Sequence, residues 1–100
     1  MTKPWEQEWR AEGCSWVERR DDVTAVAQVQ VSGSADEQAV YNRFLAAAPD
    51  MARELRHLVR LIEPLETEGG LNVPGLATLN GARRALRKAG VLPEDVRRTE

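Results

Sequence analysis

The spacing of hydrophobic residues changes part-way along this chain, and that change constrains the fold more than any other feature. Up to about residue 31, apolar and β-branched residues alternate with polar ones, as they do in half-buried strands. From Ala35 onward, apolar residues recur every three or four positions, as on one face of a helix. The two patterns meet at Ser32-Gly33-Ser34, a turn-forming run. We therefore expect an α+β fold with the sheet first.

The strand-like part predicts a three-stranded antiparallel β-meander over about residues 5–31. Breaks at Glu12-Gly13 and Arg20-Asp21-Asp22 separate the strands. The third strand has the clearest alternation, with one apolar face made by Val23, Ala25, Ala27, Val29 and Val31. A sheet this small needs a helix or a second sheet over its apolar face.

Three helices are predicted after the sheet, over about residues 35–47, 49–63 and 76–89. Ser34 and Glu37 have the spacing of a capping box at the start of the first helix. Pro49 suits the first position of the second helix, and Pro64 is expected to end that helix near Glu63. Gly90 is expected to close the third helix.

The second helix carries the strongest periodicity in the sequence. Its apolar residues follow spacings of four, three, four and three, and are Met51, Leu55, Leu58, Ile62 and Leu65. Such a stripe packs against a sheet or another helix. The sequence leaves two alternatives open, because the stripe is either consumed inside the fold or forms a homodimer seam through Met51, Leu55, Leu58 and Ile62.

A chain of 100 residues has room for one hydrophobic core. We expect a single domain over residues 1–92 and a C-terminal tail over residues 93–100, in which Pro93-Glu94-Asp95 can start one helical turn. No apolar run is long enough to span a membrane, and the first ten residues carry charges where a secretory signal would be apolar. We expect a cytoplasmic protein.

Neither catalysis nor metal binding is indicated by the reactive residues. The chain has one cysteine, Cys14, and one histidine, His57, which excludes an internal disulfide and a Cys/His zinc site. Neither residue has a partner that would make it a nucleophile or a general base. The carboxylates of the first part lack the spacing of a calcium loop, and no glycine run has a phosphate-binding pattern. We expect no enzyme, metal or cofactor.

Four cations on two turns of the last helix form the most distinctive charge cluster: Arg83, Arg84, Arg87 and Lys88. The cluster suits phosphate or an acidic protein surface, although cations near a helix C-terminus also stabilise the helix dipole. Nucleic acid is an unfavourable partner, because the net charge is −2 and the tryptophans lie in the acidic first half of the chain.

Three of the five aromatic residues are tryptophans, namely Trp5, Trp9 and Trp16. We expect Trp16 in the core, and Trp5 and Trp9 partly exposed among Glu6 and Glu8. Exposed tryptophan surrounded by charge is typical of protein-binding hot spots, although all three rings would also serve to cover a thin core.

The run from Asn42 to Met51 reads N-R-F-L-A-A-A-P-D-M, and it resembles an "AAAPD[LM]" segment of small phage and prophage accessory proteins. The end of the last helix, Ala82–Ala89, is similar to their "A-x-x-A-L-x-K-A" helix. The likeness covers about residues 9–90 and implies an origin in a phage or another mobile element. It brings no catalytic residue with it.

The resemblance leads to a functional hypothesis by class analogy. Small acidic phage proteins without catalytic residues, anti-CRISPR and other counter-defence proteins among them, act by binding a host protein. We therefore expect an inhibitor of a host protein complex, such as a CRISPR-Cas or other defence effector. The candidate contact residues are Trp5, Glu6, Glu8, Trp9, Arg83, Arg84, Arg87 and Lys88. The alternative is a nucleic-acid-associated phage regulatory factor that uses the basic last helix.

Overall fold

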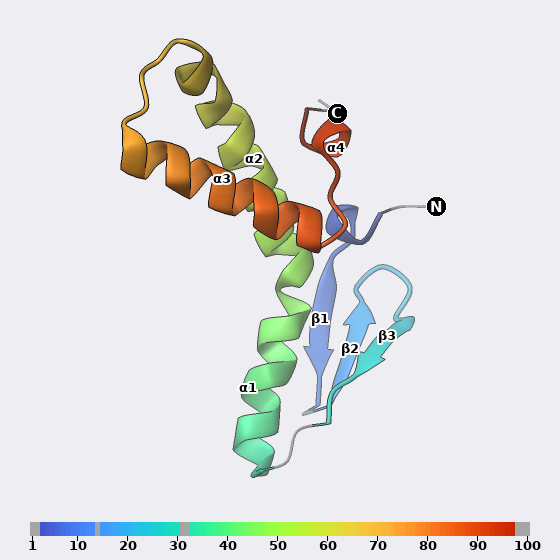
Figure 1. Ribbon diagram of the computed structural model, residues 1–100. Helices are drawn as coiled ribbons and strands as arrows, with labels where there is room; N and C mark the ends of the chain where they lie inside the picture. The colour runs from blue at the N-terminus through green and yellow to red at the C-terminus, as the bar shows by residue number, and fades with distance from the viewer. Residues whose placement is uncertain (1–2, 14, 31–32, 98–100) are drawn as a thin grey trace. The chain divides into compact units, whose positions relative to one another are not determined.

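The computed structural model describes residues 3–13, 15–30 and 33–97. The elements along the chain are a 3-10 turn, three strands and four helices (Figure 1): η1 (Pro4–Glu6), β1 (Trp9–Glu12), β2 (Trp16–Arg19), β3 (Ala25–Gln28), α1 (Ala35–Ala46), α2 (Ala48–Thr67), α3 (Val73–Lys88) and α4 (Pro93–Arg97). The prediction of an α+β fold, with a three-stranded antiparallel sheet followed by helices, is confirmed.

Two compact units make up the chain, residues 1–51 and 52–100. Unit 1 holds the sheet and α1, unit 2 holds α3 and α4, and α2 begins in the first and continues in the second. Residues 93–97 of the expected tail form α4, in which Asp95 and Val96 are buried. The single domain over residues 1–92 stays a prediction. Cys14, Val31 and residues 98–100 lie outside the described residues.

The sheet of unit 1 has the order β1-β2-β3 with both pairs antiparallel. Val17 on β2 is fully buried and pairs with Ala27 on β3. β3 is shorter than predicted because the preceding turn extends through Thr24, whose N–H donates to Asp22 Oδ1 at 3.1 Å. Val23 in this turn has a φ of +51°, which a strand does not allow. The apolar face predicted for the third strand is therefore only partly formed.

Two tryptophan expectations are wrong. Trp16 is 44% exposed, because its neighbour Val17 takes the covered face and successive strand residues point to opposite faces. Trp5 is buried, at 7% exposure, and lies in η1 rather than in a strand, so strand alternation does not determine its environment. The ammonium group of Lys3 lies 5.4 Å from the centre of the Trp5 ring, a cation–π distance. Trp9 on β1 is half-buried.

α1 packs on β1 and β2 through its small and polar residues (Figure 1). Asn42 is fully buried, and its Nδ2 donates to the backbone oxygens of Trp16 at 2.9 Å and Gly13 at 3.4 Å. Gln38 Nε2 donates to the Val29 oxygen at 2.8 Å. Ser34 caps the helix by accepting from Glu37 N–H at 3.2 Å, which confirms one half of the predicted capping box.

α2 does not end near Glu63, as Pro64 suggested, but continues to Thr67. Pro64 removes one backbone hydrogen bond from α2 but does not end the helix. The contacts that stabilise the end of α2 lie at the glycines after Thr67. Gly69, with a φ of +73°, and Gly70 donate to the oxygens of Glu66 and Leu65, the two bonds of a Schellman motif. The glycine pair therefore sets the end of the helix.

α3 begins three residues before the predicted start. Asn72 is its N-cap, accepting from Gly75 N–H at 2.9 Å, and Pro74 stands in the first turn, where a missing N–H costs nothing. The predicted end is confirmed, since Gly90 has a φ of +86° and closes a second Schellman motif. The buried apolar side chains of unit 2 come from all three of its helices and from the α3–α4 connection: Val59, Leu79, Leu86, Val91 and Val96.

Candidate protein-binding surfaces

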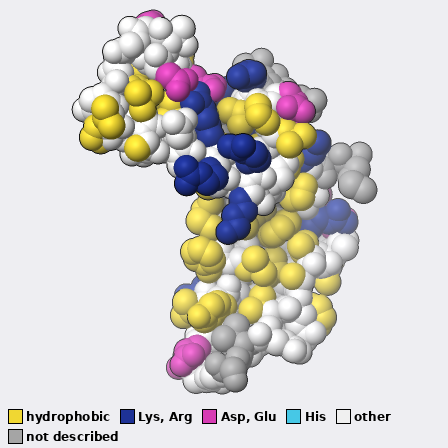
Figure 2. Space-filling view, in the orientation of Figure 1, with side chains coloured by type: hydrophobic (Ala, Val, Ile, Leu, Met, Phe, Trp, Pro, Cys, Tyr) yellow, Lys and Arg dark blue, Asp and Glu magenta, His cyan; other side chains and the backbone are white. Residues whose placement is uncertain are grey.

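Apolar side chains are unusually open to solvent in this chain (Figure 2). Among the described residues, thirteen large hydrophobic side chains are exposed, whereas eight hydrophobic residues are buried. Single exposed apolar residues are normal, but contiguous patches mark interaction sites. Two groups of these exposed residues each lie along one helix.

The first group, called the α1 face here, consists of Val40, Tyr41, Phe44 and Leu45. These residues point to solvent because the buried Asn42 and Ala46 turn the other side of α1 toward the sheet. Phe44 is the most exposed of them, at 69%. Figure 2 shows hydrophobic side chains gathered along α1. The spacing of these apolar residues in the sequence does not show which side of the helix the sheet covers.

The second group, called the α2 stripe here, consists of Leu58, Leu61 and Leu65, which are all exposed. Their spacing of three and four residues places them on one side of α2. The stripe borders a groove of about 360 Å³ between α2 and α3, whose apolar lining includes Leu55, Leu58, Ile62, Leu71, Pro74, Leu79 and Ala82. The four residues of the predicted dimer seam are thus divided, because Leu55, Leu58 and Ile62 line the groove, whereas Met51 does not; Met51 and Leu58 are exposed.

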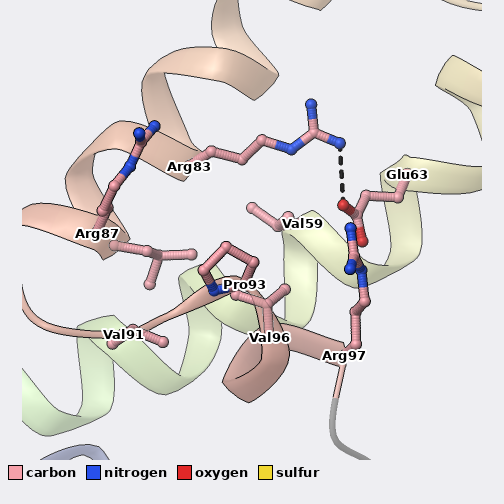
Figure 3. A pocket seen from close by; sticks show the side chains of 9 residues that line it. Val59, Glu63, Arg83, Arg87, Val91, Pro93, Val96 and Arg97 are labelled. Atoms are coloured by element: carbon pink, nitrogen blue, oxygen red, sulfur yellow. Dashed lines mark hydrogen bonds and ion pairs between the residues drawn. The ribbon is translucent and has the colours of Figure 1, made fainter.

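A second hollow in unit 2, of about 350 Å³, lies beside α4 (Figure 3). Arg87 and Arg97 line it and are exposed. Its buried apolar lining residues are Val59, Leu86, Val91 and Val96. Glu63 is the one carboxylate among the lining residues, and it is bonded to Arg83. The hollow thus offers no free acid–base pair for catalysis.

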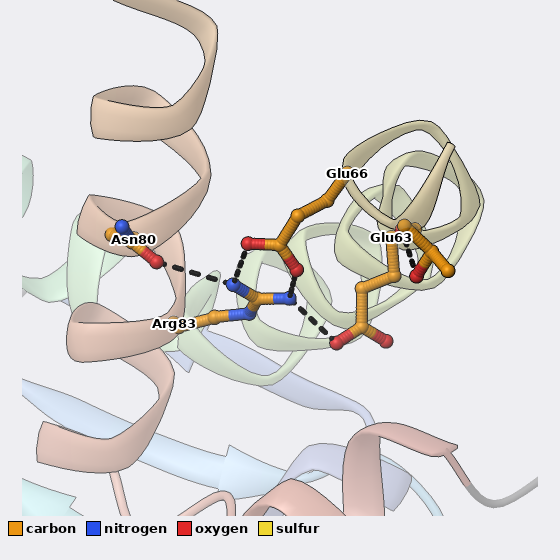
Figure 4. Close-up of polar contacts among 5 residues, drawn as sticks. Glu63, Glu66, Asn80 and Arg83 are labelled. Carbon is orange, nitrogen blue, oxygen red and sulfur yellow. Dashed lines mark hydrogen bonds and ion pairs between the residues drawn. The ribbon is translucent and has the colours of Figure 1, made fainter. Parts of the chain in front are cut away.

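Arg83 is held by two carboxylates of α2 (Figure 4). Its Nη2 donates to Glu66 Oε1 at 2.8 Å and Glu63 Oε2 at 2.9 Å, and its Nη1 donates to Glu66 Oε2 at 3.0 Å. These bonds, with Glu66 first and Glu63 second, raise the pKa of Arg83. The bond from Arg83 also lowers the pKa of Glu66. Arg83 therefore links α3 to α2, and both of its terminal nitrogens are engaged within unit 2.

The predicted four-residue basic cluster is thereby reduced to three members. Arg84, Arg87 and Lys88 are exposed at the C-terminal end of α3. Figure 2 shows Lys and Arg side chains gathered over this end of the helix. Their charge also favours the helix C-terminus through its dipole, so their position has a structural explanation beside a binding one.

The N-terminal candidates do not form an exposed tryptophan pair. Glu6 and Glu8 are exposed around a shallow hollow with Arg20 and Asp21, and Arg20 lies 4.0 Å from Glu8. Trp9 is half-buried and donates its indole N–H to Gln7 Oε1 at 2.9 Å. Of these four N-terminal candidates, Trp5 is buried and Trp9 is half-buried, whereas Glu6 and Glu8 remain accessible.

Two residues were considered for catalysis in the sequence, His57 and Cys14. His57 is exposed on α2, and Cys14 lies outside the described residues. Within the described part of the chain, no three His, Cys, Asp or Glu side chains are grouped so that they could hold a metal ion. None of the described helices combines the length and apolar character that a membrane span requires.

Comparisons with known proteins found no matching family model, and searches of curated proteins and of solved structures found no match either.

Proposed function

We propose that the protein works by binding a partner protein and carries out no chemistry itself. One observation carries the proposal, namely the excess of exposed over buried large hydrophobic side chains among the described residues. A chain this small gains stability from each apolar side chain that it buries. Leaving whole helix faces open is therefore costly unless a partner covers them.

The α2 stripe with its groove is the contact surface that we favour for this partner. The groove is of the size and apolar character that accepts one or two side chains, and the stripe supplies a rim of exposed leucines. Arg84, Arg87 and Lys88 lie on the same unit and favour a partner with acidic residues near its apolar anchor. Glu6, Glu8 and Trp9 are accessory candidates.

The partner that we propose is a host protein complex, of the CRISPR-Cas or another defence system. Support for this step comes from the resemblance of the Asn42–Met51 segment to phage and prophage accessory proteins. A non-enzymatic protein of 100 residues can inhibit a large complex by covering one essential surface of it.

Affinity capture with matched variants tests the proposal. The tagged protein is incubated with lysate of a bacterial host that carries active defence systems, and retained proteins are identified by mass spectrometry. We expect one complex to be enriched by the wild type and lost with the combined change Leu58→Ser, Leu61→Ser and Leu65→Ser. Val73→Ser is the control, because Val73 is also exposed but lies outside the stripe.

A phage plating assay gives the functional readout. Expression of the wild type should raise plating efficiency on a host with the active defence system and leave it unchanged on a host that lacks the system. Retention of the complex by the triple variant would show that the surface is wrong. Failure to retain any complex, together with unchanged plating, would overturn the proposed function.

A second candidate function, binding of nucleic acid by the end of α3, is favoured by the exposure of Arg84, Arg87 and Lys88. Electrostatic binding of this kind must weaken steeply between about 50 and 200 mM salt. The combined change Arg84→Glu and Arg87→Glu should abolish it, whereas Arg20→Glu on unit 1 should not. Binding that is insensitive to salt would reject this candidate.

A further inference from the structure

The α1 face supports an inference that goes beyond the proposed function and concerns a different surface. We infer that the protein forms a two-fold symmetric dimer in which the α1 faces of two copies pack antiparallel. Val40, Tyr41, Phe44 and Leu45 would supply the apolar contact. The pattern of charge around this face indicates that a second copy of the chain covers it.

The four side chains of the α1 face carry no charge. Glu37 precedes them on the same side of the helix, and its carboxyl group lies against Gly33 at the N-terminal end of α1. Phe44 and Val40 are 69% and 54% exposed. A contiguous aromatic and aliphatic surface without charge at its centre has the composition of an interface core.

The charges at the edge of the face are self-complementary. Asp36 lies in the first turn of α1 and Arg43 in the last, and residues seven apart project from the same flank of a helix. A two-fold axis perpendicular to both helices reverses the second copy end to end and keeps this flank on the same side. It therefore brings Asp36 of each copy opposite Arg43 of the other, with Val40 near the axis.

Both charged residues are available for this contact. Asp36 and Arg43 are exposed, and neither forms an ion pair with another described residue. A parallel pair, with the two-fold axis along the helices, would carry this flank of the second copy to the opposite side of the interface, so Asp36 and Arg43 would not meet. The charge pattern thus specifies both a second copy and its direction.

The size of the face sets the expected strength. A helix of 12 residues is about 18 Å long, and four large side chains from each copy bury an area at the low end of specific interfaces. We therefore expect a dimer in equilibrium with monomer, with a dissociation constant in the micromolar range.

Sedimentation velocity of the full chain over a concentration series tests the dimer. The wild type should shift from monomer to dimer as concentration rises. Phe44→Glu should raise the dissociation constant more than about tenfold, because it places a carboxylate at the centre of the interface. Leu58→Glu is the matched control: it is an equally drastic change at an exposed position of the α2 stripe, and it should leave the dimer intact.

A charge exchange distinguishes this interface from a general loss of apolar contact. Arg43→Asp alone should weaken the dimer, because it opposes two pairs of like charges. Adding Asp36→Arg should restore dimerisation, because the pairs reform with reversed sign. Far-UV circular dichroism of each variant verifies that α1 is intact.

Three results would overturn the inference. The first is a wild type that stays monomeric over the whole series. The second is a dimer whose dissociation constant Phe44→Glu leaves unchanged. The third is a dimer that Leu58→Glu disrupts, which would indicate the alternative seam through Met51, Leu55, Leu58 and Ile62. An Asp36→Arg, Arg43→Asp variant that folds but does not recover the dimer would refute the antiparallel register.

Discussion

The two units of this protein hold their helices by different means. In unit 1, α1 is fixed to the sheet by amide groups, with Asn42 and Gln38 donating to backbone oxygens of the sheet region. In unit 2, apolar side chains such as Leu79 and Leu86 are buried, and the Arg83 bonds to Glu63 and Glu66 link α3 to α2. One helix is thus positioned mainly by polar contacts and the others mainly by hydrophobic packing.

This difference decides which side chains face solvent. Because α1 turns small and amide side chains to the sheet, its large residues, Phe44 among them, are left outside. In unit 2, Val59 and Leu86 are buried, whereas the leucines of the α2 stripe are exposed. An apolar stripe on a helix therefore does not by itself identify the buried side. In α1, the hydrogen bonds of the Asn42 amide hold the opposite side of the helix against the sheet.

The largest effect on stability is expected from the packed unit. Leu86 is 2% exposed, so Leu86→Ala removes buried methyl groups and leaves a cavity. We expect the free energy of unfolding to fall by about 3 kcal/mol. Chemical denaturation followed by far-UV circular dichroism, which reports the helices, measures the change. A loss below about 1 kcal/mol would mean that unit 2 has no firmly packed core.

The amide contact of unit 1 should give the next largest effect. Asn42→Ala leaves the Trp16 oxygen without its donor and should lower the free energy of unfolding by about 2 kcal/mol. Denaturation followed by tryptophan fluorescence measures it, because Trp5, Trp9 and Trp16 all lie in unit 1. An apolar Asn42→Leu variant that is more stable than the wild type would contradict the statement that polar contacts hold α1 on the sheet.

The same contrast explains how much could be predicted from the sequence. Strand alternation and helical spacing are local patterns, so they predicted the order of sheet and helices and the helix stop at Gly90. Gly69-Gly70 carries the same glycine signal as Gly90, and α2 ends there rather than at Pro64. Asn72 and Pro74 carry the sequence signal of a helix start, and α3 begins there rather than at Leu76.

The candidate surfaces were predicted less well, for a physical reason. Which side of α1 faces the sheet depends on Asn42 reaching oxygens 26 and 29 residues earlier in the chain, and no local pattern encodes this contact. Likewise, the sequence does not show that Arg83 pairs with Glu63 and Glu66, because these residues lie on a different helix.

Acid sensitivity should be present in both units, and variants distinguish its sources. The pKa of Asp22 lies below its reference value of 3.8, chiefly through the Thr24 backbone N–H, and that of Glu66 lies below 4.5, chiefly through Arg83. A carboxyl with a lowered folded-state pKa stabilises the fold above its unfolded value and loses that effect as the pH falls through the folded value. Thermal unfolding temperatures should therefore decrease below a pH of about 4.5.

Each source has its own variant and readout. Glu66→Gln should flatten the acid dependence of the helical signal, and Asp22→Asn should flatten that of the tryptophan signal. Both variants should melt slightly lower than the wild type at neutral pH, because the contacts to Arg83 and Thr24 are weakened. Acid dependence that neither variant changes would place its origin in other carboxylates.

The smallest effects on stability are expected at the two open surfaces. Phe44→Ser on unit 1 and Leu61→Ser on unit 2 replace side chains that are mostly exposed, so each should change the free energy of unfolding by no more than about 0.5 kcal/mol in dilute, monomeric protein. Chemical denaturation at low protein concentration measures both. A loss above about 1 kcal/mol at either position would mean that the side chain is covered within the chain itself. Small losses at both positions, together with lost binding in the capture and sedimentation experiments, would show that these side chains serve contacts with other molecules rather than the fold.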